Sequence, residues 1–364
     1  MSAWPWLIPI AVAAVIVRGP ADELSPSAPL VPVRSSSAVA DDADDPAVWI
    51  NRRDPTRSLV LGTNKIAAPG GALYVFDLDG AVQQVVAPLD RPNNVDVEYG
   101  MPTASGAIDI AVVTERLRRR LRVFRIDERG LAPLDGGTGV PVLDGEAGEA
   151  AMPMGISLYR RPRDGAIFAI VAPKTGGLTN YLWQYRLETD PATGRVNGRL
   201  VRRFGSFSGS GEIEAVAVDD ELGYVYYADE EYALRKWHAD PDHRDAGREL
   251  AVFGLTGFTQ QREGLGIFRR RDGTGFLASS DQIEGATELR LYPREGTKGR
   301  PHDHGIGTAI VTSADSTDGL EIVSGGLPGD FRGGLLVMMN SRGRNFQFYR
   351  WTDVQRRLSK EAAR

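Results

Sequence analysis

The chain has 364 residues, of which 43 are basic and 48 acidic, and its formal net charge at pH 7 is −5. This balance creates no overall positive field, so we expect no nucleic-acid partner. Cysteine is absent, which excludes disulfides, thiolate zinc sites and cysteine nucleophiles. The length and the 42 glycines fit one large domain built mainly from strands and tight turns.

The first 20 residues contain an apolar run, Trp4 to Val17, with the length of a signal-peptide core. The run is short for a membrane span, and because no Lys or Arg precedes it, an uncleaved anchor or a mis-chosen start stays an alternative. Residues 21–38 are rich in Pro, Ser and Ala and are predicted to be a disordered lead-in. We therefore predict a secreted or periplasmic protein whose mature domain, residues 39–356, does not insert stably into a membrane.

An acidic run, Asp41-Asp42-Ala43-Asp44-Asp45, comes directly before the first apolar strand. Carboxylate oxygens crowded at a strand entrance suit a hard cation such as Ca²⁺, although an isolated run of this kind is also typical of a solvated turn. Acidic residues recur at the entrances of later strands, which favours the cation site. These later segments are Asn93-Asn94-Val95-Asp96, Glu212-Ile213-Glu214, Arg262-Glu263-Gly264-Leu265 and Thr317-Asp318-Gly319-Leu320.

The strand entrances mark a repeat of 48 to 61 residues. Its six anchors are Pro46, Asn94, Gly155, Ile213, Glu263 and Asp318. Within a unit, apolar strands alternate with turns rich in Asp and Gly, which is typical of hairpins. Six such units predict an all-β fold, a six-bladed β-propeller with four-stranded antiparallel blades. We expect strands from both termini to close the ring, a monomeric state, and no helix except a short one from Val354 onward.

Arginines cluster between residues 116 and 125. They are Arg116, Arg118, Arg119, Arg120, Arg122 and Arg125. Such a run is typical of a solvated hairpin face. Because guanidinium groups match phosphate oxygens in pairs, a phosphate-binding lip is the competing interpretation, and both stay open.

The order and spacing of several segments resemble the β-propeller phytases. The segments are Asp42 to Trp49, Thr63-Asn64-Lys65, Asn93-Asn94-Val95-Asp96, Glu263-Gly264-Leu265, Ala278-Ser279-Ser280, Asp318-Gly319, and Asn345-Phe346 with Trp351. Each is weak alone, but together they are specific and extend over nearly the whole chain. The resemblance implies a six-bladed propeller that hydrolyses phytate (myo-inositol hexakisphosphate) with several Ca²⁺ ions at an acidic channel mouth.

The resemblance also implies roles for individual residues. It places Asp45, Glu214, Glu230, Glu263 and Asp318 among the calcium ligands, with Asp44, Asp96 and Asn340 as weaker candidates. It places Lys65, Arg116 and Lys174 as cations that bind substrate phosphates, and with Glu230 they form the predicted catalytic set. For each of these residues the alternative is a turn, a salt bridge or an ordinary surface charge.

The composition excludes several phosphatase chemistries. No cysteine can act as nucleophile, and the four histidines do not form an Arg-His-Gly motif and are too few for a purple-acid bimetal site. They are His238, His243, His302 and His304. What remains is metal-assisted attack by water, with carboxylates holding the ions and Lys or Arg neutralising phosphate. This agrees with the resemblance, which implies a Ca²⁺-dependent phosphoric monoester hydrolase of the 3-phytase type that acts on phytate or another phosphate ester.

Five positions depart from the family pattern. Met154 stands where a Tyr is usual, Thr175 replaces a Glu, Gln261 an acidic residue and Asp281 a Gln, while Thr312 lies near a missing carboxylate. Ca²⁺ accepts six to eight ligands, so one loss is tolerated, but several losses would weaken ion binding or change which ester fits. Two alternatives therefore stay open: a calcium-binding propeller with lactonase or phosphodiesterase activity, and a non-catalytic binding module.

Overall fold

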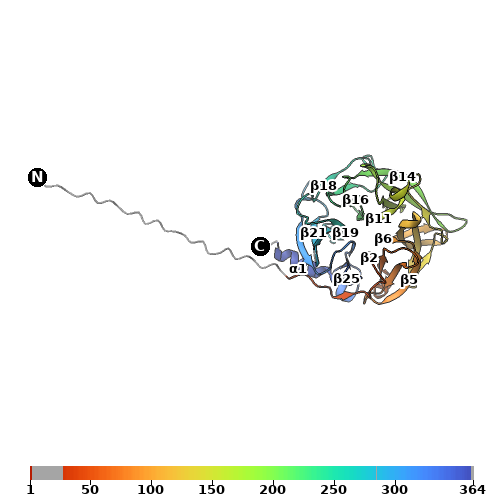
Figure 1. Ribbon diagram of the computed structural model, residues 1–364, viewed down its shortest axis with the longest axis horizontal. Helices are drawn as coiled ribbons and strands as arrows, with labels where there is room; N and C mark the ends of the chain where they lie inside the picture. Colours follow the sequence, from red (N-terminus) through yellow and green to blue (C-terminus); the bar gives the residue numbers. More distant parts are fainter. Residues whose placement is uncertain (2–27, 284, 362–364) are drawn as a thin grey trace.

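A computed structural model describes residue 1, residues 28–283 and residues 285–361. Apart from its first residue, the predicted signal segment (residues 1–20) lies outside the described residues. Six small antiparallel sheets are arranged around a central axis (Figure 1). Five of them have four strands, and the sheet that comes second along the chain has five. The predicted six-bladed β-propeller is confirmed.

The first three blades follow one another along the chain. Blade 1 consists of β2 (Ala43–Trp49), β3 (Leu59–Asn64), β4 (Gly71–Phe76) and β5 (Val82–Leu89). Blade 2 consists of β6 (Pro92–Thr103), β7 (Gly106–Glu115), β8 (Arg120–Asp127) and β10 (Val140–Pro141), with β9 (Gly130–Pro133) as the additional partner of β8. Blade 3 consists of β11 (Pro153–Arg160), β12 (Ile167–Pro173), β13 (Thr179–Thr189) and β14 (Val196–Ser206).

The last three blades complete the ring. Blade 4 consists of β15 (Val216–Asp219), β16 (Tyr224–Asp229), β17 (Ala233–His238) and β18 (Ala251–Phe253). Blade 5 consists of β19 (Arg262–Arg269), β20 (Gly275–Ile283), β21 (Ala286–Pro293) and β22 (Thr308–Thr312). Blade 6 combines β23 (Leu320–Val323), β24 (Leu335–Asn340) and β25 (Asn345–Arg350) with β1 (Arg34–Ser35) from the start of the chain.

Blade 6 closes the ring with strands from both ends of the chain, as predicted. In β1, Arg34 pairs with Phe348 and Ser35 with Gln347 of β25. The structure differs here from the predicted disordered lead-in (residues 21–38), because β1 lies inside that segment. Two paired residues are too few to produce a strand pattern in the sequence, so the partner strand decides their conformation.

The hydrophobic cores lie between neighbouring blades. They form because successive side chains of a strand point to opposite faces of its blade. Val60 of β3 packs in a cluster with residues of blade 6, whereas Leu61, the next residue, packs in a cluster with residues of blade 2. Successive side chains of a strand point to opposite faces, and in a ring of blades both faces are covered. Inner strands therefore read as continuous apolar runs.

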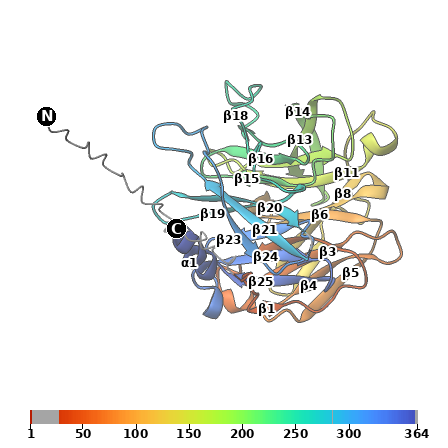
Figure 2. The same cartoon turned by 60° about the vertical axis from the view of Figure 1, so that its left-hand side comes forward.

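One α-helix, α1 (Trp351–Glu361), lies at the outside of the ring beside β25 (Figure 2). It begins three residues before the predicted start at Val354. The Trp351 ring stacks on Phe268 with a centroid distance of 4.3 Å, which fixes the helix to the blade 5 side of the closure. Within the described chain, no helix is both long and apolar enough to cross a membrane.

The innermost strands of the six blades surround a channel with a cavity of about 310 Å³. Its lining is acidic and includes Asp45, Asp96, Glu98, Asp220, Asp318 and Glu321. Because the blades are antiparallel and equivalent, the entrances to the first strands and the links between second and third strands lie at one face of the ring. The other links lie at the opposite face. The candidate site occupies the first of these faces.

Candidate active site

The three predicted cations occupy equivalent places in three blades. Lys65 directly follows β3, Lys174 directly follows β12, and Arg116 directly follows β7 as the first residue of a short 3-10 helix. In each blade this is the link between the second and third strands. The repeat therefore brings side chains 51 and 58 residues apart to the same rim of the channel.

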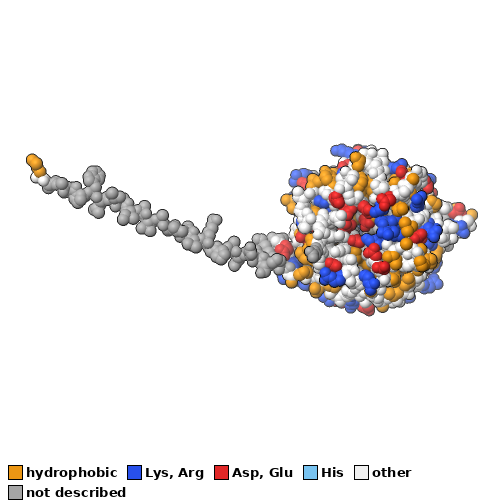
Figure 3. Space-filling model, viewed as in Figure 1, with side chains coloured by type: hydrophobic (Ala, Val, Ile, Leu, Met, Phe, Trp, Pro, Cys, Tyr) orange, Lys and Arg blue, Asp and Glu red, His pale blue; other side chains and the backbone are white. Residues whose placement is uncertain are grey.

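The predicted carboxylates enter the same rim from strand entrances. Asp44 lies in the irregular start of β2, Glu214 precedes β15, and Asp318 precedes β23. Glu263 is the second residue of β19, and Glu230 follows β16 in the link equivalent to those of the cations. Figure 3 shows acidic and basic side chains gathered side by side near the middle of the face in view.

Lys65 is held between two carboxylates from different blades. Its Nζ lies 2.9 Å from Asp44 Oδ1 and 2.5 Å from Asp318 Oδ2. Burial alone would lower the pKa of Lys65, but the two carboxylates raise it above its ordinary value. Burial raises the pKa of Asp44 to about 6, because Lys65 only partly offsets the burial and the neighbouring Asp318. Gln282 Nε2 also donates to Asp318 Oδ1 at 2.6 Å.

Arg116 lies between Glu214 and Met154. One terminal nitrogen of its guanidinium lies 3.5 Å from Glu214 Oε1 and contacts the thioether sulfur of Met154. Its Nε is buried and has no hydrogen-bond partner among the described residues. Burial, reinforced by Asp44, raises the pKa of Glu214 to about 8. Arg116 thus keeps at least one guanidinium N–H without a partner among the described residues.

Lys174, Glu212, Glu230 and Glu263 form a connected group on the blade 4 side of the rim. Lys174 forms an ion pair with Glu212, and the backbone N–H of Glu212 donates to Glu230 Oε2. The carboxyl groups of Glu230 and Glu263 hydrogen-bond each other. Burial raises the pKa of Glu263 well above its ordinary value, and Glu214 and Glu230 raise it further. Ionising all three acids here is costly unless a cation joins them.

The comparisons with known proteins match this geometry. The model of the family described as Phytase matches residues 13–358. A 3-phytase of Bacillus subtilis (strain 168) is 30% identical over 331 residues, which cover 87% of this chain and 81% of that protein. The chain belongs to the phytase family. The resemblance found in the sequence and the prediction of a phytase enzyme are both confirmed.

Within this phytase fold, Asp45 and Asp96 are placed differently from the rim carboxylates. Asp45 Oδ2 accepts from the Val95 N–H at 3.0 Å, and Asp96 Oδ2 accepts from the Leu158 N–H at 2.7 Å. Ser157 Oγ also donates to Asp96 Oδ2, at 3.0 Å. Both carboxylates therefore connect the inner strands of adjacent blades, and a calcium role for either stays a prediction.

Asn340 lies at the end of β24 in blade 6. Its Oδ1 accepts from the Asp315 N–H at 3.1 Å, and its Nδ2 donates to Asn345 Oδ1 at 2.8 Å. In the described parts of the chain, no ion pair or hydrogen bond connects it to a predicted phosphate-binding cation. Its calcium role also stays a prediction.

Two residues of the rim were not among the predicted site residues. Glu212 pairs with Lys174, and Gln282 donates to Asp318. Glu212 lies in the acidic segment noted in the sequence, two positions before Glu214. Because acidic and apolar residues alternate in Glu212-Ile213-Glu214, this pattern could have indicated that Glu212 lies on the same side as Glu214. Gln282 carried no such signal, because its partner lies 36 residues away in another blade.

Two departures from the phytase pattern have structural roles. The buried Asp281 accepts from the backbone N–H groups of Thr259, at 2.6 Å, and Gln260, at 2.9 Å. Thr312 is buried, and its hydroxyl donates to the Thr287 carbonyl at 3.1 Å. Asp281 therefore supports the loop before β19, whereas Thr312 bonds the neighbouring strand β21 of its own blade.

Proposed function

We propose that this chain releases phosphate from phytate by calcium-dependent hydrolysis at the rim of the propeller channel. Membership of the phytase family supports the substrate class. The observation that carries the proposal is the placement of Lys65 between Asp44 and Asp318. Cations for phosphate and carboxylates for metal ions are interleaved there on one surface.

The side chains at the rim fit Ca²⁺. The donor set consists of carboxylate oxygens, which hard cations prefer. Asp44 Oδ2 is buried and has no hydrogen-bond partner in the described chain. Burial and neighbouring acids raise the pKa values of Glu214 and Glu263, a cost of ionisation that a bound cation would offset. In this proposal Asp44, Glu214, Glu230, Glu263 and Asp318 hold the ions. Asp45, Asp96 and Asn340 are weaker candidates for holding the ions, because backbone N–H groups already donate to their side-chain oxygens.

The ion pairs explain why hydrolysis would require a metal. While Lys65 is paired with Asp44 and Asp318, the carboxylates offset its charge and repel a phosphate. The same holds for Arg116 beside Glu214. With a divalent cation held by these carboxylates, Lys65 and Arg116 would be free to bind phosphate oxygens. Metal binding would thus convert an anionic rim into an anion-binding one.

In the proposed reaction, Lys65, Arg116 and Lys174 bind the phosphate and offset the charge on its equatorial oxygens. A bound Ca²⁺ ion would supply positive charge that lowers the pKa of a water and polarises the phosphate. Glu230, whose pKa burial raises, is placed beside Glu263 to take a proton from the attacking water. Water attacks phosphorus in line with the departing inositol oxygen, and no side chain forms a covalent bond.

The test is phosphate release from phytate with and without Ca²⁺. Excess EGTA should abolish release, and added CaCl₂ should restore it. EGTA should also lower the melting temperature, because an ion that binds only the folded state stabilises it. At an ion concentration 100 times the Kd, the free energy of unfolding rises by about 2.7 kcal/mol. A bis-ester of phosphate and a lactone, assayed in parallel, separate the phosphodiesterase and lactonase alternatives. Unchanged phytate hydrolysis and melting in EGTA would refute the calcium proposal.

Export and a monomeric state complete the proposal. The apolar run of residues 4–17 supports export to the periplasm or the medium. The closed ring leaves no blade without its fourth strand, which supports a monomer. Cell fractionation of the full chain tests the first point, and sedimentation of the purified protein tests the second.

A further inference from the structure

All four histidines of the chain gather at one end of blade 4, away from the rim. His238 ends β17, His243 lies in the following loop (residues 239–250), and His302 and His304 lie between β21 and β22. Tyr224 connects the two loops, because its ring centroid lies 5.5 Å from His238 and 5.6 Å from His302. The proposed hydrolysis uses none of these side chains.

His304 has a structural role. Its Nδ1 donates to the Pro293 carbonyl at 2.7 Å, so its Nε2 accepts from Lys236 Nζ at 3.2 Å. Both ring nitrogens are therefore occupied. This leaves His238 and His243, whose rings stack with a centroid distance of 3.6 Å and an interplanar angle of 24°.

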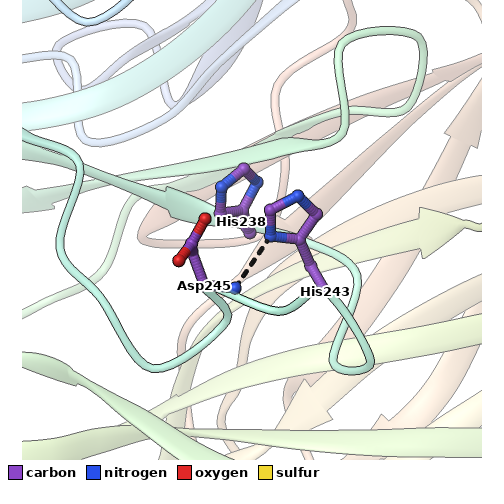
Figure 4. A group of neighbouring side chains, drawn as sticks. All are labelled: His238, His243 and Asp245. Carbon is purple, nitrogen blue, oxygen red and sulfur yellow. Dashed lines mark hydrogen bonds between the residues drawn. The ribbon is translucent and has the colours of Figure 1, made fainter.

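His238 and His243 form a cluster with Asp245, drawn in Figure 4. One imidazole nitrogen from each histidine and one carboxylate oxygen all lie within 4.8 Å of one another. Across the described residues, this is the one group of three His, Asp or Glu side chains that meets that distance. At the rim, Lys65 stands between Asp44 and Asp318.

The lone pairs of this cluster are accessible to a metal. No hydrogen bond within the described chain uses either ring nitrogen of His238, so both remain open to a ligand. His243 Nδ1 accepts from the Asp245 N–H at 3.1 Å. A metal at Nδ1 would take the lone pair of this bond, and a metal at Nε2 would leave the ring proton on Nδ1, so coordination at either nitrogen would replace the bond. Asp245 pairs only with the exposed Arg244, at 3.3 Å, and such surface pairs are weak.

We propose that His238, His243 and Asp245 bind a divalent transition metal such as Zn²⁺, through two imidazole nitrogens and one carboxylate oxygen. Imidazole favours Zn²⁺, Ni²⁺ and Cu²⁺ over Ca²⁺, so this site differs in kind from the all-oxygen rim. Three protein ligands leave a fourth tetrahedral position for water or another ligand. Small rotations of the two rings out of their stack bring both nitrogens toward one ion.

The metal would fasten the loop of residues 239–250 to the end of β17. The same loop is already attached to blade 3, where Arg161 contacts Asp240 at 3.1 Å and Asp242 at 2.7 Å. A metal at His243 and Asp245 would add a further attachment, in a chain that has no cysteine for a disulfide. It would therefore stabilise the boundary between blades 3 and 4.

This site lies on the face opposite the candidate active site. Glu230 follows β16 at one end of the β16–β17 hairpin, whereas Tyr224 pairs with His238 at its other end. Six residues of strand span about 20 Å. Metal binding here and calcium binding at the rim are thus separate, and each can be lost without the other.

The test is Zn²⁺ binding to the full protein in excess CaCl₂, which occupies oxygen-only sites. Isothermal titration should show one Zn²⁺ per chain. His243→Ala and Asp245→Asn should weaken binding, the former by roughly 100-fold, because a lost nitrogen ligand removes a large share of the binding free energy. Asp242→Asn, on the same loop, is the matched control and should bind as wild type does. All three variants should release phosphate from phytate as wild type does.

Co²⁺ provides a second measurement, because tetrahedral nitrogen and oxygen coordination gives it an intense visible spectrum. The spectrum should appear with wild type and Asp242→Asn and be absent with His243→Ala. Zn²⁺ should raise the melting temperature of wild type more than that of His243→Ala. Equal Zn²⁺ affinity in wild type and His243→Ala, or no binding to wild type at millimolar Zn²⁺, would overturn the proposal.

Discussion

Acidic side chains at the rim of the channel and acidic side chains inside it have opposite electrostatic surroundings. At the rim, Asp44 and Asp318 contact Lys65, and Glu214 contacts Arg116. Inside the channel are Asp96, Glu98, Asp220 and Glu321, and none of these four forms an ion pair in the described structure. Burial is the main cause of their raised pKa values.

Two of the interior carboxyls, those of Asp96 and Asp220, connect blades. Asp96 accepts from the Leu158 N–H of the next blade, and Asp220 Oδ1 accepts from the Arg160 N–H at 3.0 Å. Inner strands of adjacent blades do not share a sheet, so their free N–H groups need such acceptors. Burial raises the pKa of Asp220 to about 7 and that of Glu321 to about 8. The difference is that the acids at the rim lie beside cations, whereas these interior acids do not.

The largest expected difference is between Glu263→Gln and Glu98→Gln. Glu263→Gln removes a carboxylate that the proposal assigns to an ion, so phosphate release from phytate should fall roughly 1000-fold at saturating Ca²⁺. Glu98→Gln, the interior control, replaces an acid that burial already favours in its neutral form, so activity should stay close to wild type. Steady-state kinetics on both variants gives the answer. Near-wild-type activity of Glu263→Gln would contradict the role of the rim.

A smaller loss is expected from Lys65→Ala. Lys65 is one of three cations at the rim, so its removal should lower kcat/KM for phytate by roughly 10- to 100-fold, less than the loss in Glu263→Gln. Lys298→Ala, at an exposed position, is the matched control and should have no effect. If Lys65→Ala lost more activity than Glu263→Gln, the lysine and not the metal would dominate catalysis.

The smallest effect on activity is expected from Glu321→Gln inside the channel. The folded-state pKa of Glu321 is about 8, above the ordinary value of 4.5, so the folded state binds this proton more tightly than the unfolded state does. Wild-type stability should therefore fall as pH rises from about 5 to 8, at up to about 1.4 kcal/mol per pH unit for this group. Urea unfolding in EGTA should show a weaker pH dependence in Glu321→Gln. Identical pH profiles would show that Glu321 is not a buried acid.

Much of the fold could be predicted from the sequence because each blade repeats a local pattern. The anchors Pro46, Asn94 and Gly155 all lie in inner strands, and the closure by strands from both termini was also predicted. The strand β1 was missed, since Arg34 and Ser35 become a strand only by pairing with residues more than 300 positions later. Non-local pairing of so short a segment leaves no periodic signal.

The sequence indicated residues of the candidate site but not the contacts between them. The sequence indicated Lys65 and Asp318 separately, but the ion pair between them spans 253 residues and depends on ring closure. The sequence also grouped Asp45 and Asp96 with the rim, because acidic residues at strand entrances look alike. Only the structure shows that these two carboxylates accept from backbone N–H groups of adjacent blades.

The central claim is that metal binding at the rim frees Lys65 and Arg116 for phosphate. Titration calorimetry with myo-inositol hexasulfate, an analogue that carries similar charge without a phosphate to release, tests it most directly. We expect binding in CaCl₂ at least roughly 100-fold tighter than in EGTA, because without the ions the carboxylates compete for the same cations and repel the ligand. Equal affinity in CaCl₂ and in EGTA would contradict the account.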